Sequence, residues 1–312
     1  MQDEPTKPVT INRYQRSAPP DAAADQPTYT KQTCDDLVAV EEPLEIRIAF
    51  GSADQRRSKS LAITMRTPGN DIELATGFLL SENVIQSASQ IQRSEHVGPS
   101  PENGTHGNTL IVDLDPSVDF SIERLQRHFY MTSSCGVCGK ASIEAVMAQG
   151  FKPVASVVQL TTETIASLPS NLRTQQNIFD DTGGLHAAGL FNQDGALLAL
   201  REDVGRHNAV DKLIGYQLIS LHQPTLLATE NSQLNDAQAG RVLVVSGRAS
   251  FELVQKALAA SLEVLVAVGA PSSIAVQLAD EFNLTLIGFA SANKFNVYSG
   301  FDRVRFRDNS DS

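Results

Sequence analysis

The sequence predicts an α/β protein, with a largely parallel sheet in its C-terminal third and an α+β portion before it. Three runs that are apolar on both faces, 241–245, 264–268 and 284–289, alternate with helical patterns at 250–260 and 271–282. Strands of this kind are typical of parallel sheets covered by helices on both sides. Residues 43–50 and 61–65 instead alternate apolar and polar side chains, which is the period of half-buried strands.

The N-terminal portion follows from local patterns. Residues 1–33 are rich in proline and have no sustained periodicity, so we expect a disordered tail. The two alternating strands form a hairpin, and a helix follows Asn70. A strand at 109–114 and a helix at 121–131 complete the portion that we assign to residues 34–130.

The remaining portion, 131–312, begins with a loop at 132–140 that leads into a helix at about Lys140. Two short helices precede residues 181–184, and a hairpin made of 185–191 and 196–201 turns at Asp194-Gly195. A further helix begins near Gly205, and the apolar strands of the sheet follow.

Composition excludes several classes of protein. The 312 residues carry 25 Lys and Arg against 36 Asp and Glu, a net charge of −11, which argues against a general nucleic-acid binder. The chain has no apolar run of about 18 residues that would span a membrane. Its first residues lack the basic and apolar regions of a secretory signal, so we expect a cytoplasmic protein.

Two of the three cysteines, Cys135 and Cys138, stand together in a Cys-Gly-Val-Cys loop. A thiol just before a helix and close to Lys140 has a lowered pKa and is reactive as the thiolate. A structural zinc site would need two further ligands, and a thioredoxin-type loop would lie at the start of a compact βαβ unit. Inert thiols are the remaining alternative, but the loop favours a nucleophilic or sulfur-carrying cysteine.

Positive and polar side chains are predicted at one edge of the sheet. Arg206 and His207 begin the helix near Gly205, where amide groups favour an anion, although Glu202, Asp203 and Asp211 are able to neutralise both. Arg248 follows the strand 241–245, and residues 288–298 follow the last strand. Ligands of open α/β sheets bind beyond the carboxyl ends of the strands. His186 alone is ambiguous, because a lone histidine beside a strand is more often structural.

Five segments in order carry a family resemblance: CGVCG at 135–139, TGGLHAA at 182–188, EDVGRHNAVDK at 202–212, SGRASFELVQK at 246–256 and FNVY at 295–298. With these motifs the chain resembles the FdhD family of sulfur carriers, which are required to make active formate dehydrogenase, over about residues 40–305. The resemblance implies a cytidine-deaminase-like layered fold and a cytoplasmic sulfurtransferase.

The resemblance also implies partners and site residues. Cys135 would carry, as a persulfide, sulfur from a cysteine desulfurase, and Cys138 would assist its transfer to the molybdenum cofactor, Mo-bis-molybdopterin guanine dinucleotide. The catalytic subunit of formate dehydrogenase is the implied recipient, and a homodimer is the implied assembly. The implied cofactor-binding segment is Ala290, Ser291, Ala292, Asn293, Lys294 and Phe295, to which the sheet-edge argument adds Arg206, His207 and Arg248.

Two rival functions remain open. A zinc-dependent deaminase would use a Cys-x-x-Cys pair, but it also needs a His-x-Glu triplet before it, and none precedes Cys135. A non-catalytic chaperone would shield the cofactor or dock formate dehydrogenase, and it would not need either cysteine. We assign no resident metal to the protein.

Overall fold

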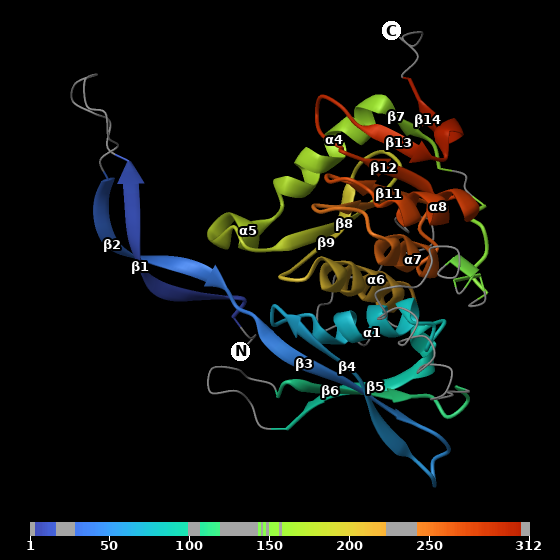
Figure 1. Cartoon of the computed structure of the whole chain (residues 1–312). Helices are drawn as coiled ribbons and strands as arrows, with labels where there is room; N and C mark the ends of the chain where they lie inside the picture. The colour runs from blue at the N-terminus through green and yellow to red at the C-terminus, as the bar shows by residue number, and fades with distance from the viewer. Residues whose placement is uncertain are drawn as a thin grey trace, which may run out of the picture.

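The computed structural model describes residues 4–16, 29–98, 107–118, 143–144, 146–147, 150–155, 158–222 and 242–306. The predicted helix at 121–131 and the loop at 132–140, with Cys135 and Cys138, lie outside these residues. In the part that is described, the chain forms two large sheets with helices packed between them, a small two-stranded sheet and a projecting β-hairpin (Figure 1). None of the described helices has the length and apolarity needed to cross a bilayer.

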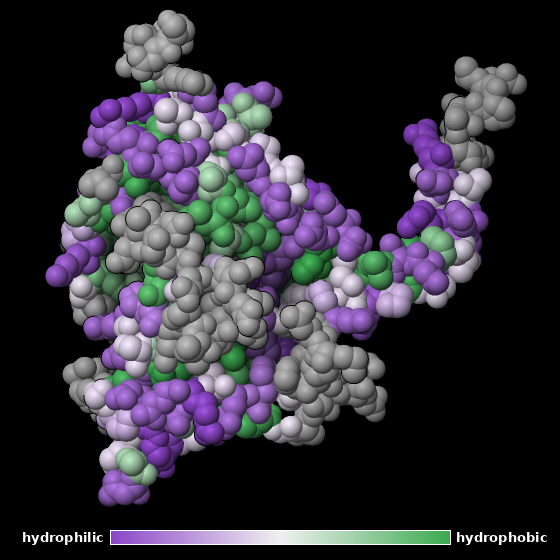
Figure 2. All heavy atoms as spheres, turned by 180° about the vertical axis from the view of Figure 1, so that it is seen from behind, coloured by the Kyte–Doolittle hydropathy of each residue, from purple (hydrophilic) through white to green (hydrophobic). Residues whose placement is uncertain are grey.

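The N-terminal hairpin was not predicted. Strand β1 (Thr6–Arg16) pairs antiparallel with β2 (Tyr29–Ala39) along their whole length, where residues 1–33 were expected to be a disordered tail. The two strands are rich in threonine and other residues that favour extended backbone, but they lack an apolar face, so their sequence pattern resembled disorder. The far end of the hairpin projects from the molecule in both views (Figures 1 and 2), whereas Ala39, at the end of β2, lies next to Gly184.

A four-stranded sheet, in the order β4-β3-β6-β5, forms the next layer. It contains β3 (Glu42–Phe50), β4 (Arg57–Arg66), β5 (Ile91–Val97) and β6 (Thr109–Leu114), with the short 3-10 helix η1 (Ala88–Gln90) before β5. The predicted hairpin and the strand at 109–114 are confirmed. Helix α1 (Asp71–Ser81) covers one face of this sheet (Figure 1), and the buried alternate residues Leu44, Ile46 and Ile48 contribute to the core there.

Helix α6 (Arg206–His222) packs directly on α1, and two glycines allow the contact. A Cβ at Gly77 would lie 1.9 Å from the carbonyl oxygen of Asp211, and a Cβ at Gly215 would lie 1.9 Å from that of Glu73. No side chain fits at either position without moving the opposite backbone. The close approach joins the N-terminal layer to the C-terminal portion.

The six-stranded sheet has the order β13-β12-β11-β10-β8-β9. Strands β10 (Val242–Val245), β11 (Val264–Ala267) and β12 (Thr285–Gly288) are parallel, as predicted. Strands β8 (His186–Phe191), β9 (Leu197–Asp203) and β13 (Asn296–Ser299) are antiparallel to their neighbours, so "largely parallel" was wrong for the whole sheet. Short connections join β8 to β9 and β12 to β13, and these permit only antiparallel pairing.

Helices cover both faces of this sheet. On one side lie α6, α7 (Phe251–Ala259) and α8 (Ser273–Glu281), which share a core with Leu243, Leu265 and Leu286. On the other side, α4 (Thr162–Arg173) packs against Val244 and Val266. The short helix α5 (Asn177–Thr182) and the small pair β7 (Leu160–Thr161) with β14 (Val304–Arg305), preceded by η4 (Phe301–Arg303), complete the described elements.

Candidate functional site at the sheet edge

The loops after the three parallel strands meet at one edge of the sheet, as predicted. The backbone N–H of Gly269, after β11, donates to the carbonyl of Gly247, after β10, at 2.9 Å. The N–H of Phe289, after β12, donates in turn to the carbonyl of Gly269 at 3.0 Å. These bonds hold the three loops side by side, because the loop at the carboxyl end of each strand is hydrogen-bonded to the loop of the next strand.

A pocket of about 600 Å³ opens at this edge, and we call it the sheet-edge pocket. Ser246 and Val268 form its floor beside Ala290, Ser291 and Ala292. Half of the predicted cofactor-binding segment therefore lines a pocket. Its position beyond the carboxyl ends of parallel strands is the usual position of a ligand site in α/β sheets.

The other half of that segment lies elsewhere. The backbone N–H and the hydroxyl of Ser291 both donate to the carbonyl of Lys294, at 2.9 and 3.0 Å, which closes a tight turn. Asn293 and Lys294 are exposed on this turn and do not line the pocket, whereas Phe295 packs against the core of the sheet.

The opposite wall of the pocket comes from α4 and α5, which the sequence analysis did not assign to the site. The guanidinium of Arg173 lies 4.5 Å from the centre of the Phe179 ring and forms a 2.5 Å ion pair with Asp180. Gln176, buried between these helices, also lines the pocket. Nothing in the local pattern distinguishes these residues from ordinary helix positions, so only the fold could identify them.

His186 lines the pocket, and Arg206, which does not line it, lies nearby. A Cβ placed on Gly247 would be 3.6 Å from His186 Nδ1 and 3.9 Å from Arg206 Cδ, so both side chains pack against this glycine. The buried Nε of Arg206 has no hydrogen-bond partner among the described residues. Burial lowers the pKa of His186, and the positive charges of Arg206 and His207 lower it further.

The other predicted cations point away from the pocket. His207 Nε2 lies 3.3 Å from the Ser250 hydroxyl and 3.9 Å from a carboxylate oxygen of Glu252. With Ser250, this histidine lowers the pKa of Glu252 to about 2. His207 lines a separate pocket of about 350 Å³ between β4, α1, α6 and α7. Arg248 is exposed on its loop and packs against Gly269.

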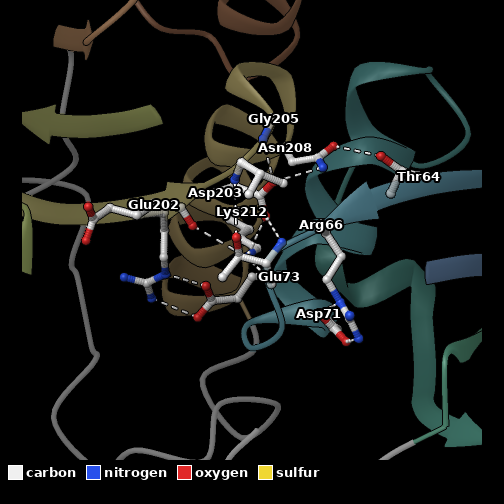
Figure 3. Close-up of polar contacts among 12 residues, drawn as sticks. Thr64, Arg66, Asp71, Glu73, Glu202, Asp203, Gly205, Asn208 and Lys212 are labelled. Carbon is white, nitrogen blue, oxygen red and sulfur yellow. Dashed lines mark hydrogen bonds and ion pairs between the residues drawn. The ribbon is translucent and has the colours of Figure 1, made fainter. Parts of the chain in front are cut away.

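Most charges of the segment 201–212 are used in a second region, the inter-layer ion-pair cluster (Figure 3). Asp203, fully buried, pairs with Lys212 at 2.8 Å and accepts the backbone N–H of Thr67 at 3.1 Å. The members of the cluster are Arg66, Asp71, Glu73, Arg201, Asp203, Asn208, Asp211, Lys212 and Lys256.

The three acids that the sequence offers as partners of Arg206 and His207, namely Glu202, Asp203 and Asp211, are therefore engaged elsewhere. Asp211 accepts two hydrogen bonds from Lys256 Nζ, at 2.7 and 2.9 Å. Glu202 accepts the backbone N–H groups of Ile178 and Phe179 at 3.2 and 3.0 Å. These three acids therefore do not pair with Arg206 or His207, and the acid nearest to His207 is Glu252 instead.

Among the described residues, no group of three metal-ligating side chains is placed to hold an ion. The free thiol of Cys34 lies in β2, on the projecting hairpin. The positions of Cys135 and Cys138 relative to the sheet-edge pocket are outside the described residues, so their predicted role stays a prediction.

Comparison with known proteins agrees with the motifs. The model of the FdhD/NarQ family matches residues 39–305. The chain is 48% identical over 275 residues to the sulfur carrier protein FdhD of Streptomyces coelicolor, a match that covers 87% of this chain and 90% of that protein. The protein of the same name from Thermoplasma volcanium is 39% identical over 277 residues, which cover 89% and 92% of the two chains.

A solved structure shares the fold. The crystal structure of a protein described as a formate dehydrogenase accessory protein, from Desulfotalea psychrophila, superposes with a TM-score of 0.61 at 22% identity. The match covers 95% of this chain and 100% of that one. At this identity the likeness to the solved structure concerns the fold alone. The match to the family model and the identity to the curated relatives establish the family of this chain. The chain belongs to the FdhD/NarQ family.

Proposed function

We propose that the protein is a sulfur carrier in the maturation of formate dehydrogenase, which takes sulfur from a cysteine desulfurase and passes it to Mo-bis-molybdopterin guanine dinucleotide. The relatives named above are sulfur carrier proteins, and the solved neighbour is described as a formate dehydrogenase accessory protein. The cofactor is here a substrate, because the protein modifies it and hands it on.

The observation that carries the proposal is the sheet-edge pocket, which lies beyond the carboxyl ends of the parallel strands. Arg206 lies near it, because its side chain and that of His186 both pack against Gly247. The cargo is anionic through its phosphates, and the buried Nε of Arg206 has no hydrogen-bond partner among the described residues. Ala290–Ala292 line the same pocket, which supports the segment that the resemblance implies.

The loading step is an exchange between sulfur atoms. The Cys135 thiolate attacks the outer sulfur of the donor persulfide, so that a new S–S bond forms on Cys135 and the donor cysteine leaves as its thiolate. In the release step, Cys138 attacks the Cys135 sulfur, a disulfide forms, and the outer sulfur leaves as hydrosulfide. The two cysteines are oxidised and the transferred sulfur is reduced, so the electrons balance without an added reductant.

The finer assignments belong to the same proposal. They are the catalytic subunit of formate dehydrogenase as recipient, a cytoplasmic location, a homodimer, a deaminase-like arrangement of the layers and a part boundary at 130/131, whereas strand β2 runs through the expected boundary at 33/34. Asn293, Lys294, His207 and Arg248 lie outside the sheet-edge pocket, so they would contact only the parts of a large cargo that extend beyond it.

Mass spectrometry after incubation with a cysteine desulfurase and cysteine tests the proposal. We expect one additional sulfur atom on the peptide that contains Cys135, and none on that peptide in Cys135→Ala. Cys34, a half-buried thiol on the hairpin, is the internal control. Persulfide confined to Cys34, or full formate dehydrogenase maturation by Cys135→Ala, would contradict the proposal and favour the chaperone; stoichiometric zinc would favour the deaminase.

A further inference from the structure

The projecting hairpin has strand edges that the rest of the chain does not use. Strands β1 and β2 form a two-stranded sheet by themselves, so each keeps one edge without a backbone partner among the described residues. The far end of the hairpin projects from the molecule (Figure 1), and an isolated two-stranded hairpin is at best marginally stable in water. The hairpin also precedes residue 39, where the match to the family model begins. A free edge of this length is a template for pairing with another chain.

One face of β2 carries an ordered series of side chains. Alternate residues of a strand lie on the same face, and on this face all of them are exposed: Tyr29, Lys31, Thr33, Asp35 and Leu37. The series is complementary to itself when it is read from its two ends. An aromatic ring at one end matches an aliphatic side chain at the other, and a cation matches an anion.

A two-fold axis through Thr33 would bring these matches together. Two copies of β2 related by such an axis run antiparallel, and Lys31 of one copy then lies opposite Asp35 of the other. Tyr29 of one copy likewise lies opposite Leu37 of the other, and the symmetry makes each match occur twice. Opposite charges, or an aromatic and an aliphatic side chain, stabilise an antiparallel pair when they face each other directly, whereas like charges destabilise it.

The free edge of β1 does not offer such a match. The charged residues of this strand are Lys7, Arg13 and Arg16, with no acid among them, so a pairing of β1 with its own copy would bring together cations only. Pro8 also removes one backbone N–H from the strand. Strand β2 contains neither proline nor glycine and has charges of both signs. The edge of β2 is therefore the one suited to a second copy.

We propose that two copies of this chain associate through the free edge of β2, in the antiparallel register centred on Thr33. The inference rests on the homodimer of the proposed function, for which it names the surface, and it does not involve the sulfur chemistry. The hairpin already orients two of the residues concerned. The Thr10 hydroxyl donates to Asp35 at 3.0 Å, and the Thr33 hydroxyl donates to Asn12 at 2.9 Å.

Reversal of single charges tests this register. Lys31→Asp places carboxylates opposite each other in a pair of identical copies, and Asp35→Lys places ammonium groups opposite each other. We expect the dimer of either variant to dissociate about tenfold more readily than wild type in sedimentation equilibrium, because attraction becomes repulsion at both symmetric positions. Arg93→Asp, a charge reversal at an exposed position of β5, is the control and should associate as wild type does.

A mixture of the two variants gives a result that no general loss of stability would give. In a mixed pair, a carboxylate again faces an ammonium group at both positions. We expect an equimolar mixture of Lys31→Asp and Asp35→Lys to associate with the affinity of wild type, although neither variant does so alone. The double variant Lys31→Asp/Asp35→Lys should also recover the wild-type affinity.

A disulfide at the two-fold axis provides a second measurement. In a Cys34→Ser background, Thr33→Cys should form a cross-linked dimer with a mild oxidant, because directly opposite residues have Cβ atoms about 4.5–5.5 Å apart. Thr30→Cys in the same background is the matched control, because its two copies would lie about 20 Å apart along the paired strands. Peptide mapping of the cross-linked dimer identifies the link at position 33.

Single variants that associate as wild type does, or a mixture that associates no more tightly than its components, would overturn the inference. A wild type that stays monomeric would also overturn it, and this is the result expected if the hairpin pairs with a different protein. These outcomes leave the proposed sulfur transfer intact, because that proposal depends on the loading of Cys135.

Discussion

The inter-layer ion-pair cluster and the start of α6 draw on the same twelve-residue stretch, 201–212, but they treat charge in opposite ways. In the cluster, buried Asp203 and Lys212 are paired and hydrogen-bonded across to the N-terminal layer. At the start of α6, Arg206 keeps a buried Nε without a hydrogen-bond partner among the described residues. Buried charges that are fully paired fix one arrangement of the chain, whereas a charge left unpaired is available for a ligand.

Removing a paired charge should have the largest effect on stability. Asp203→Ala leaves Lys212 buried without its carboxylate, and we expect a loss of about 3–5 kcal/mol in the free energy of unfolding. Asp180→Ala is the matched control, because its ion pair with Arg173 is about half exposed and should contribute less than about 1 kcal/mol. If urea denaturation shows the same loss of unfolding free energy for Asp203→Ala and Asp180→Ala, the cluster does not hold the layers together.

The glycine contact beneath the cluster provides the next test. Gly215→Ala places a methyl group against the Glu73 carbonyl, and we expect about 1–3 kcal/mol of destabilisation or more, because a backbone must move. Gly184→Ala is the control, since its nearest neighbour would be 3.7 Å away. The unfolding temperatures of the two variants are compared with that of wild type. An unchanged unfolding temperature in Gly215→Ala would contradict the close packing of α1 on α6.

The start of α6 should respond in anion binding rather than in stability. Arg206→Gln removes a cation from the start of α6, where the helix dipole disfavours it, so stability should stay equal or rise by a few tenths of a kcal/mol, about what a helix-end charge contributes. Its affinity for guanosine diphosphate, measured by calorimetry, should fall about tenfold. Arg93→Gln, an exposed residue of β5, should bind as wild type does. If Arg206→Gln binds guanosine diphosphate as tightly as wild type does, the anion binds at a different place in the protein.

The smallest predicted effect is on the stability of the fold at acid pH. The folded-state pKa of Glu252 is lowered to about 2, below the unfolded value of 4.5, so its contribution is present above pH 4.5 and is lost as the pH falls toward 2. Because this carboxylate is half exposed, we expect about 1 kcal/mol or less after solvent screening. The difference in unfolding free energy between wild type and Glu252→Gln should shrink across that window, and a constant difference would show that His207 does not hold the carboxylate.

The elements that the sequence predicted are those with a local pattern. The apolar runs of β10, β11 and β12 and the turn at Asp194-Gly195 need no distant partner to be identified, and their carboxyl-end loops meet as predicted. Contacts across the chain could not be predicted in this way. The bond from the Thr67 N–H to Asp203 spans 136 residues, so the segment 201–212 gave no indication of which of its charges would be paired.

Two parts of the site show the same limit. His207 follows Arg206 directly, yet it lies against Ser250 and Glu252 because consecutive positions of a helix face different directions. The wall formed by Arg173, Gln176 and Phe179 belongs to the pocket only because α4 covers the far face of the sheet. Neither arrangement has a signature in the local sequence.

The bound cargo tests the central claim most directly. Wild type and Ala292→Trp, which places a large side chain at an exposed position on the pocket wall, would be purified gently from cells that make formate dehydrogenase. We predict that wild type carries one molybdenum for every two guanine-bearing pterins, measured by elemental analysis and pterin fluorescence, and that the variant carries neither. An empty wild type, or a variant loaded to the same extent, would contradict the account.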